Sequence, residues 1–376
     1  MAALFLLLHS LEFSVIHDVS ATAAVRAVGA SHNDNTQHAW RNRLASYARP
    51  SVVRANIQLA NTALPFLMCM AFLLWGLDHA YWLAWPLAVP AALFTVRLFV
   101  IQHDCGHLSF LRSRRANELV GFAISLLTLV PYVSWRRAHA VHHATTGNLD
   151  LRGTGDITTL TVGEYLAQPA WRKLLYRLYR NPLVMLGAGP FYLLLIHNRM
   201  PAPSARRDWR SWVSVLSTNL AASGMIVGVS LITAPFVVVL AWGAVLLLAT
   251  AVGLWLFRIQ HQFEDAYWER AQNWDFRAAA IEGSSFYDLP RLLRWFTGDI
   301  GLHHIHHLAS RIPNYRLRAC WEQNRELQRA KRLSLWGSIK SAKLSLWDEE
   351  RRKLVSFRRA AASSARERLP RNASCP

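Results

Sequence analysis

Four long apolar stretches, which together contain a single charged residue, constrain the fold of this chain more than any other feature. They occupy about residues 55–77, 80–102, 211–233 and 234–257. Each is long enough to cross a bilayer, for which about 20 apolar residues suffice. The stretches form two adjacent pairs, so the sequence predicts an integral membrane protein with two transmembrane hairpins. The one charge, Arg97, lies near the end of its stretch and can extend to the membrane surface.

Two shorter apolar segments, residues 119–133 and 183–196, determine which parts of the chain can meet. Both fall short of the usual spanning length, so we interpret them as interfacial or re-entrant helices. With only four crossings, the N-terminus, the loop after the second span and the region after the fourth span share one side of the membrane. If only one of the short segments crossed the membrane, at least one of the three histidine clusters described below would lie on the opposite side from the first.

Basic residues are concentrated on this common side. The net charge is +19, and the chain from residue 303 onward is strongly basic. By the positive-inside rule, this side and both termini are predicted to be cytoplasmic. Such a charge can also indicate nucleic-acid binding, but no recognisable nucleic-acid module accompanies it. Contact with anionic lipid headgroups and with an acidic protein partner explains the charge better.

Three histidine clusters lie on the same side. They read His103-Asp-Cys-Gly-His107, His139-Ala-Val-His142-His143 and His303-His304-Ile-His306-His307. Spacings of three and four residues place imidazoles on one face of a helix. Because about four ligands saturate one zinc ion, eight suitably spaced histidines indicate two metal ions. His304 points to a different face, and we predict that it has a structural role or supports a neighbouring ligand.

The clusters and the residues around them resemble the membrane fatty acid desaturases. The three histidine boxes of that family correspond here to HDCGH, HAVHH and HHIHH. The flanking segments 258–268 (RIQHQFEDAYW) and 298–315 (GDIGLHHIHHLASRIPNY) are similar to the Δ12/ω-6-type acyl-lipid subgroup, including its bacterial members. The resemblance covers about residues 45–335, the expected membrane domain. Residues 1–44 are then an N-terminal extension and residues 336–376 a basic tail, both expected to be partly disordered.

The expected fold is all-α, with four transmembrane helices in two hairpins and a cytoplasmic helical cap that carries the histidine boxes. The resemblance implies two iron ions that activate O₂ and remove two hydrogens from an acyl chain. The implied ligands are His103, His107, His139, His142, His143, His261, His303, His306 and His307. His261 is included because it matches a further ligand position that the family has outside the boxes. Carboxylates expected to orient these imidazoles are Asp104, Glu264, Asp265 and Asp299, with ordinary helix-end or interfacial charges as the alternative.

The product and the electron donor are expectations of the same resemblance. The expected product has a cis double bond at Δ12 of an oleoyl lipid, and the alternative positions are Δ9 and Δ5. The sequence contains no His-Pro-Gly-Gly haem motif of a fused cytochrome b5, so electrons are expected from a separate carrier. An acidic ferredoxin suits the basic face, and cytochrome b5 and flavodoxin are the alternatives. The membrane would be a bacterial inner membrane.

Two other functions are alternatives to desaturation. The same histidine site can hydroxylate or ketolate an acyl chain, an alkane or a carotenoid. A membrane metal transporter, which belongs to another class, needs ionisable residues within its spans. Residues 211–257 contain none, which disfavours a transporter.

Overall fold

Four long helices form the centre of the computed structural model, which describes residues 40, 42–153, 155–201 and 205–367. They are α4 (Val52–Asp78), α5 (Ala88–Gly106) with the short helix η1 (Trp82–Leu87) before it, α11 (Trp209–Val229) and α12 (Pro235–His261). All four are long and apolar enough to cross a membrane when η1 and α5 are taken together. They coincide with the four predicted spans to within a few residues, so the prediction of a membrane protein is confirmed.

The helices differ in how much of their surface is covered. α5 packs against α4, α12 and α6 (Arg114–Thr128), and its Leu98 and Ile101 are fully buried. In contrast, α4 and α11 expose large apolar side chains, among them Leu67, Phe72 and Leu220. A wide exposed apolar surface on a helix is typical of contact with lipid. α5 is therefore the central helix, with α4 and α11 on the lipid-facing flanks.

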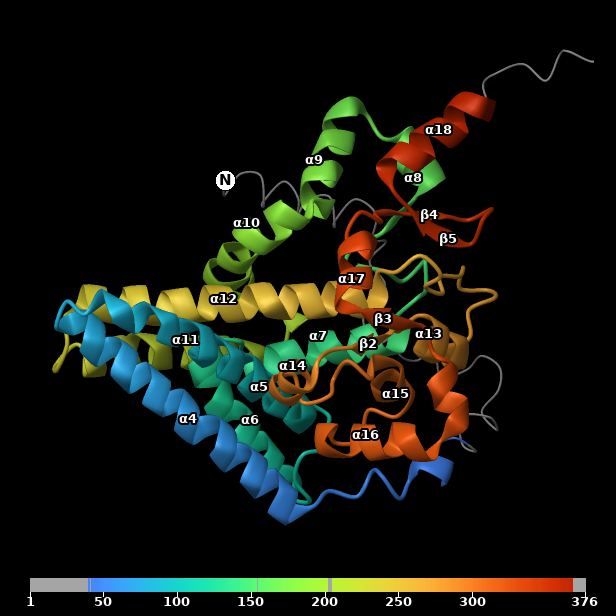
Figure 1. The fold of residues 1–376 in the computed structure, drawn as a ribbon. Helices are drawn as coiled ribbons and strands as arrows, with labels where there is room; N and C mark the ends of the chain where they lie inside the picture. The colour runs from blue at the N-terminus through green and yellow to red at the C-terminus, as the bar shows by residue number, and fades with distance from the viewer. Residues whose placement is uncertain (1–39, 41, 154, 202–204, 368–376) are drawn as a thin grey trace, which may run out of the picture.

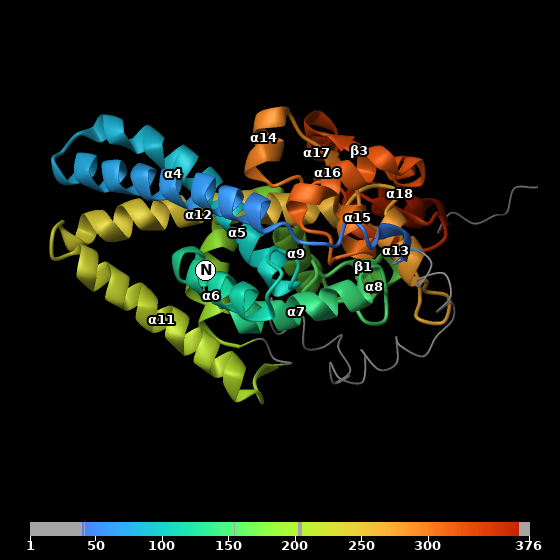
Figure 2. The ribbon, with the colours of Figure 1, turned by 90° about the horizontal axis from the view of Figure 1, so that it is seen from below.

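The turn after α4 and the turn before α12 lie together at one end of the helices (Figures 1 and 2). There the backbone N–H of Ala234 donates to Oδ1 of Asp78 over 3.0 Å. Pro235 begins α12 at a position where its missing N–H costs no helical hydrogen bond. Consequently the C-terminal ends of α5 and α12, which carry His103 and His261, lie at the opposite end.

A sharp bend between α6 and α7 (Tyr132–Thr145) brings the second histidine cluster back toward α5. The two helices meet at 103°. Leu129 ends α6 in a left-handed conformation (φ 55), and Pro131 follows it, so the helix cannot continue in the same direction. α6 and α10 (Pro182–Leu195), with 15 and 14 residues, are each too short to span a membrane alone. The two short apolar segments therefore have the predicted lengths, although α6 and α7 together could form one broken span.

Short helices and strands surround the histidine-bearing end. The helices are α8 (Val162–Ala167), α9 (Ala170–Arg180), η2 (His197–Arg199), α13 (Phe276–Glu282), α14 (Arg291–Phe296), α15 (His303–Leu308), α16 (Asn314–Gln323), η4 (Arg325–Arg329), α17 (Leu335–Ser341) and α18 (Phe357–Glu367). The strands are β1 (Leu160–Thr161), β2 (Phe286–Asp288), β3 (Arg332–Ser334), β4 (Leu346–Asp348) and β5 (Lys353–Val355).

The described chain is mostly helical, as predicted, and these short strands are an addition that the sequence did not predict. One sheet has the order β1-β4-β5, in which β4 is parallel to β1 and antiparallel to β5, and β2 and β3 form a separate parallel pair. Strands of two or three residues are too short to show an alternating pattern in the sequence. Their partners also lie far apart along the chain, where local spacing carries no signal.

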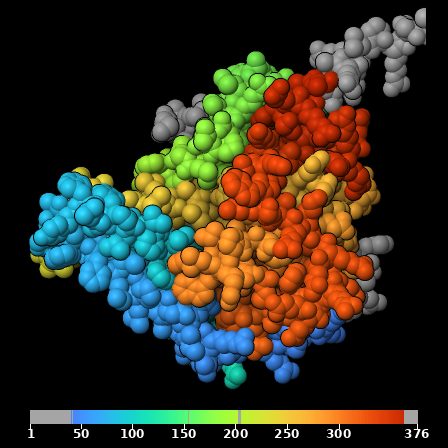
Figure 3. Space-filling model, viewed as in Figure 1, coloured from blue at the N-terminus to red at the C-terminus, as the bar shows by residue number. Residues whose placement is uncertain are grey.

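The C-terminal segment is part of this fold as far as Glu367. The charge pattern predicts a basic tail from residue 336, whereas α17, β4, β5 and α18 occupy that segment. Trp347 and Leu354 are buried in the same hydrophobic core as α5 and α12. In Figure 3 the segment, coloured red, packs beside the green α9 and α10. Residues 1–39 of the expected N-terminal extension and residues 368–376 lie outside the described residues.

The position of the two turns leads to a prediction about topology. A reporter inserted at the exposed Ala80, in the turn after α4, is expected on the opposite side of the membrane from reporters inserted after Arg112 or fused behind Glu367. The reason is that Arg112 and Glu367 belong to the histidine-bearing end of the molecule. Enzyme reporters that are active on only one side provide the measurement. If the reporters at Arg112 and Glu367 were found on different sides, the α6–α7 pair would have to cross the membrane.

Candidate metal centre

The structure gathers the nine predicted ligands into two groups at the ends of α5 and α12. The five-histidine group contains His103, His107, His139, His143 and His306. The four-histidine group contains His142, His261, His303 and His307. Within each group the candidate ligand atoms lie within 4.8 Å of one another. Each group is thus compact enough to surround one metal ion.

Three helices and one helix end supply these side chains. His103 lies in the last turn of α5, and His107 follows as its C-cap. His261 is the last residue of α12. The second cluster lies on α7, and the third forms most of α15, whose residues are all buried. Because helical residues three and four apart share a face, each short segment can present two or three imidazoles to the same space.

The second and third clusters are each divided between the two groups. His139 and His143 of α7 face the five-histidine group, whereas His142 faces the other. On α15, His306 belongs to the first group and His303 and His307 to the second. The rings of His143 and His307 stack across the boundary with centroids 4.2 Å apart. The two groups are therefore in direct contact.

Ring nitrogens converge inside each group. In the first group Nε2 of His143 lies 3.1 Å from Nε2 of His139 and 2.9 Å from Nε2 of His306. In the second group Nε2 of His303 lies 3.0 Å from that of His261 and 3.1 Å from that of His307.

Two further nitrogens support a metal-binding arrangement. Nε2 of His107 and Nε2 of His142 are buried without a hydrogen-bond partner in the described part of the chain. Buried polar atoms are normally hydrogen-bonded, so orphaned nitrogens call for an explanation. Imidazole nitrogens that converge on one space are the donor set expected for a transition-metal ion. The residues present therefore fit a pair of metal ions.

The outer nitrogens of three ligands are held by acceptors. Nδ1–H of His103 donates to Oδ1 of Asp104 over 3.1 Å, and Nδ1–H of His261 donates to the carbonyl of Gly283 over 3.2 Å. Nδ1–H of His142 donates to Asp156. A proton on Nδ1 leaves the lone pair on Nε2, which is the atom that faces the group. These contacts select the tautomer that can bind a metal.

Burial disfavours the charged form of three candidate ligands outside the membrane helices, His107, His306 and His307. Burial, and then the neighbouring imidazoles, lower the pKa of His306 and the pKa of His307 well below the ordinary value. Burial, His103, His142 and the nearby Arg311 lower the pKa of His107 in the same way. Neutral imidazole is the form that binds metals, so the site does not have to release protons from these rings near neutral pH.

Of the four predicted orienting carboxylates, only Asp104 contacts a candidate ligand. Its second oxygen accepts from the backbone N–H and the side-chain amide of Asn314, over 2.6 and 2.8 Å, which fixes the carboxylate against the start of α16. The side chains of the other three extend from the turns after α12 and before α15 toward the surface, which favours the alternative of ordinary helix-end or interfacial charges. Among the described residues they pair with basic side chains: Glu264 with Lys353 and Arg359, Asp265 with Lys331 and Lys353, and Asp299 with Arg318.

Two residues show what local spacing can and cannot indicate. Asp156 contacts His142 but lies in a loop, without a motif or helical spacing to mark it in the sequence. His304 lies outside both groups, and its Nε2–H donates to the carbonyl of Leu327 over 2.9 Å. A structural or supporting role was predicted for His304 because it points to a different helix face.

Comparison with known proteins agrees with this geometry. A family model described as fatty acid desaturase matches residues 80–338, which include all nine candidate ligands. The chain belongs to the fatty acid desaturase family. It is therefore an oxidoreductase, and the resemblance described above is confirmed. A fatty acid desaturase of Bacillus subtilis is 45% identical over 318 residues, which cover 84% of this chain and 89% of the relative.

More distant relatives come from Synechocystis. An sn-1 oleoyl-lipid 12-desaturase is 29% identical over 223 residues, 58% of this chain and 62% of the relative. An sn-1 acyl-lipid omega-3 desaturase (ferredoxin) is 33% identical over 235 residues, 60% of this chain and 62% of the relative. These desaturases act on acyl lipids according to their names.

The division into two groups predicts different consequences for neighbouring histidines. His139→Ala and His307→Ala, one from each group, are expected to lower the metal content of the purified protein and to abolish activity. His304→Ala is expected to retain the metal but to lower the free energy of unfolding by about 1–3 kcal/mol, because a buried hydrogen bond is lost. The exposed His79 provides the control, and His79→Ala should leave the metal content, the activity and the free energy of unfolding unchanged. Loss of metal in the His304 variant without loss of stability would contradict the assignment.

Proposed function

We propose that this desaturase introduces a cis double bond into the acyl chain of a membrane lipid, at a site with two iron ions, using O₂ and electrons from a separate carrier. The single observation that carries the proposal is the contact between a five-histidine and a four-histidine group at the ends of two membrane helices. The nine histidines would be the ligands. When bound, iron ions with neutral nitrogen ligands supply the oxidising power needed to remove hydrogens from an unactivated carbon chain.

The protein's own residues would orient the ligands and exclude water. Trp135 stacks on His139 with ring centroids 4.7 Å apart. Phe257 lies against His142 and His261, with centroid distances of 5.2 and 5.5 Å. Apolar rings beside the ligands keep water away from a strongly oxidising site and provide a surface suited to methylene groups.

The substrate would reach the site from the bilayer. The ligands lie at or just beyond the ends of α5 and α12, so a lipid acyl chain has to bend out of the membrane to reach them. The named acyl-lipid specificity of the Synechocystis relatives supports such a substrate. A 12-desaturase among the relatives favours a Δ12 bond in an oleoyl lipid, with Δ9 or Δ5 behind it. A hydroxylase or ketolase remains the alternative for the same site, and the relatives' names favour desaturation.

Electrons would enter on the side of the five-histidine group. His107, His139 and His143 are only half-buried, whereas all four members of the other group are buried. The net charge of +19 suits an acidic carrier, and the names of several relatives include ferredoxin. A ferredoxin is therefore the proposed donor, at the cytoplasmic face of a bacterial inner membrane. Cytochrome b5 and flavodoxin are the alternatives.

Fatty acid profiling tests the proposal. A bacterial host that lacks polyunsaturated fatty acids, given this protein and a ferredoxin system, is expected to accumulate a new diene such as linoleate. The reason is that a fixed distance between the headgroup and the irons selects one position along the chain. Mass spectrometry that locates double bonds provides the measurement, and His307→Ala is the inactive control. Hydroxylated or ketolated products without any new double bond would replace desaturation by the alternative.

A further inference from the structure

Asp156 is a buried carboxylate that contacts the four-histidine group from outside the three histidine motifs. It accepts from Nδ1–H of His142, and its side chain is 7% exposed. The lone pair on Nε2 of His142 is thereby directed into the four-histidine group, where that atom is buried without a hydrogen-bond partner among the described residues. Asp156 is thus placed to set the tautomer and the ring orientation of one candidate ligand.

The segment that carries Asp156 has little regular structure of its own. We call residues 146–159, of which all but 154 are described, the Asp156 loop; it connects α7 to β1. Gly155 has a left-handed backbone (φ +74), and a Cβ at this position would lie 2.9 Å from the carbonyl oxygen of Ala138 and 3.1 Å from Cβ of His142. The backbone beside Asp156 therefore packs directly on the helix that bears His142. This close packing depends on how the rest of the loop is held.

The C-terminal hairpin, by which we mean β4 and β5 with their connection (residues 346–355), pairs with the end of the loop. β1 follows the Asp156 loop directly, and its Leu160 pairs with Leu346 of β4. The backbone N–H of Leu354 in β5 donates to the carbonyl of Glu264 over 2.8 Å, three residues after His261. The hairpin thus contacts the chain segment that follows His142 and the one that follows His261.

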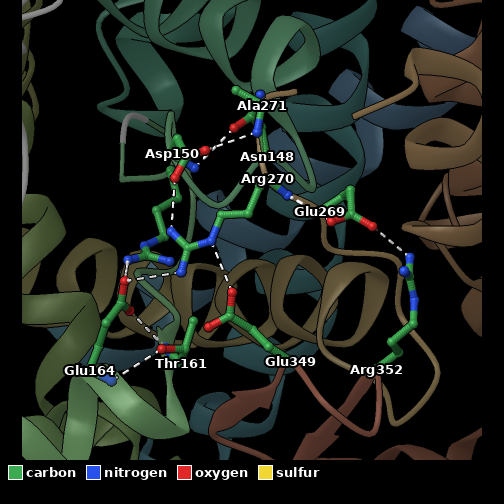
Figure 4. Close-up of polar contacts among 10 residues, drawn as sticks. Asn148, Asp150, Thr161, Glu164, Glu269, Arg270, Ala271, Glu349 and Arg352 are labelled. Atoms are coloured by element: carbon green, nitrogen blue, oxygen red, sulfur yellow. Dashed lines mark hydrogen bonds and ion pairs between the residues drawn. The ribbon is translucent and has the colours of Figure 1, made fainter. Parts of the chain in front are cut away.

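An ion-pair network ties the hairpin to the loop at the surface (Figure 4). Arg270 donates to Asp150 of the loop over 2.8 Å and to Glu349 of the hairpin over 2.9 Å. Arg352 of the hairpin donates to the carboxylate of Glu269 over 2.7 Å, and the backbone of Glu269 accepts from the N–H of Leu149 in the loop. A single exposed ion pair contributes little, but several that share one arginine form a network.

A buried contact reinforces the same connection. Arg180 of α9 is 1% exposed and donates to the carbonyl of Thr158 over 3.1 Å, to that of Leu344 over 3.3 Å, and to the side chain of Gln262. One guanidinium therefore joins the loop, the residues before β4 and the residue after His261. Loss of these acceptors would leave the buried charge of Arg180 unsatisfied, so separating these segments would be strongly destabilising.

We propose that Asp156 is a positioning residue for His142 and that the C-terminal hairpin holds the Asp156 loop in place. This rests on the proposed function, because it takes the four-histidine group to bind a metal ion. The hairpin lies beyond residue 338, where the family match ends. Support for the metal centre is thus supplied by a segment outside the matched family region.

Metal titration of the full chain tests the role of Asp156. Protein stripped with a chelator in detergent is titrated with Co²⁺, and the wild type is expected to bind one ion per histidine group. Asp156→Ala should lower the affinity for one of the two Co²⁺ ions by about 10- to 100-fold. Asp156→Asn keeps an acceptor oxygen without the charge, so an intermediate effect is expected. Glu326→Ala, which removes an exposed carboxylate paired with Arg43 away from the loop and the hairpin, is the control and should bind as wild type.

The outcomes separate this inference from the proposed function. If His142→Ala loses one Co²⁺ while Asp156→Ala and Asp156→Asn keep both at wild-type affinity, the positioning role is overturned and the proposed function stands. If His142→Ala also keeps both ions, the proposed function fails. Thermal unfolding of the metal-free variants is measured alongside. A fall in stability with wild-type affinity for both ions would reduce Asp156 to a structural residue and overturn its positioning role.

Cutting the surface network tests the role of the hairpin. Glu349→Ala combined with Arg352→Ala removes its ties to Arg270 and Glu269 but leaves the buried contacts intact. Amide hydrogen exchange in the Asp156 loop and Co²⁺ release from one group are expected to accelerate about 5- to 30-fold. Arg332→Ala, which removes an exposed ion pair with Asp288 between β3 and β2, is the control. Wild-type exchange and wild-type release in the double variant would overturn the role of the hairpin.

Discussion

Nine imidazoles whose ring nitrogens converge on one space are the constraint on which the rest of this structure depends. This convergence of nitrogens is stabilised only when a metal ion accepts their lone pairs. The outer nitrogens therefore need acceptors that hold each ring in the right tautomer. Asp104, Asp156 and the carbonyl of Gly283 do this for three of the rings. Each acceptor comes from a segment that another part of the fold must hold.

The membrane helices provide the rigid part of that scaffold. α5 and α12 are packed against each other, and both end at the metal centre with a histidine in the last turn. A helix in a bilayer satisfies its own backbone hydrogen bonds, so its end is a well-defined platform for a ligand. The bend between α6 and α7 and the buried helix α15 then bring the remaining ligands to these two ends. The desaturase site is thus assembled at the membrane surface, where an acyl chain and a protein donor can both reach it.

Much of the fold and the site follows from local patterns. The length and apolar character of the four spans predict their number, and histidine spacing predicts which rings share a helix face. The resemblance to desaturases supplied the ninth candidate ligand, His261. Local patterns left the role of Glu264, Asp265 and Asp299 open, because proximity in sequence to a candidate ligand does not determine where a side chain extends. They failed for the short strands and for the segment after residue 336, whose few apolar residues pack against distant partners.

The sequence by itself determined the membrane class, the candidate ligands and the desaturase family, because each depends on spacing or composition within a short segment. Only the tertiary structure decided that the ligands divide into groups of five and four, with His142 apart from its neighbours on α7. It also decided that Asp156 contacts His142 and that the C-terminal hairpin pairs with the strand that follows the Asp156 loop. These features depend on contacts between segments far apart along the chain, such as Leu160 with Leu346, and local spacing carries no information about which distant segments meet.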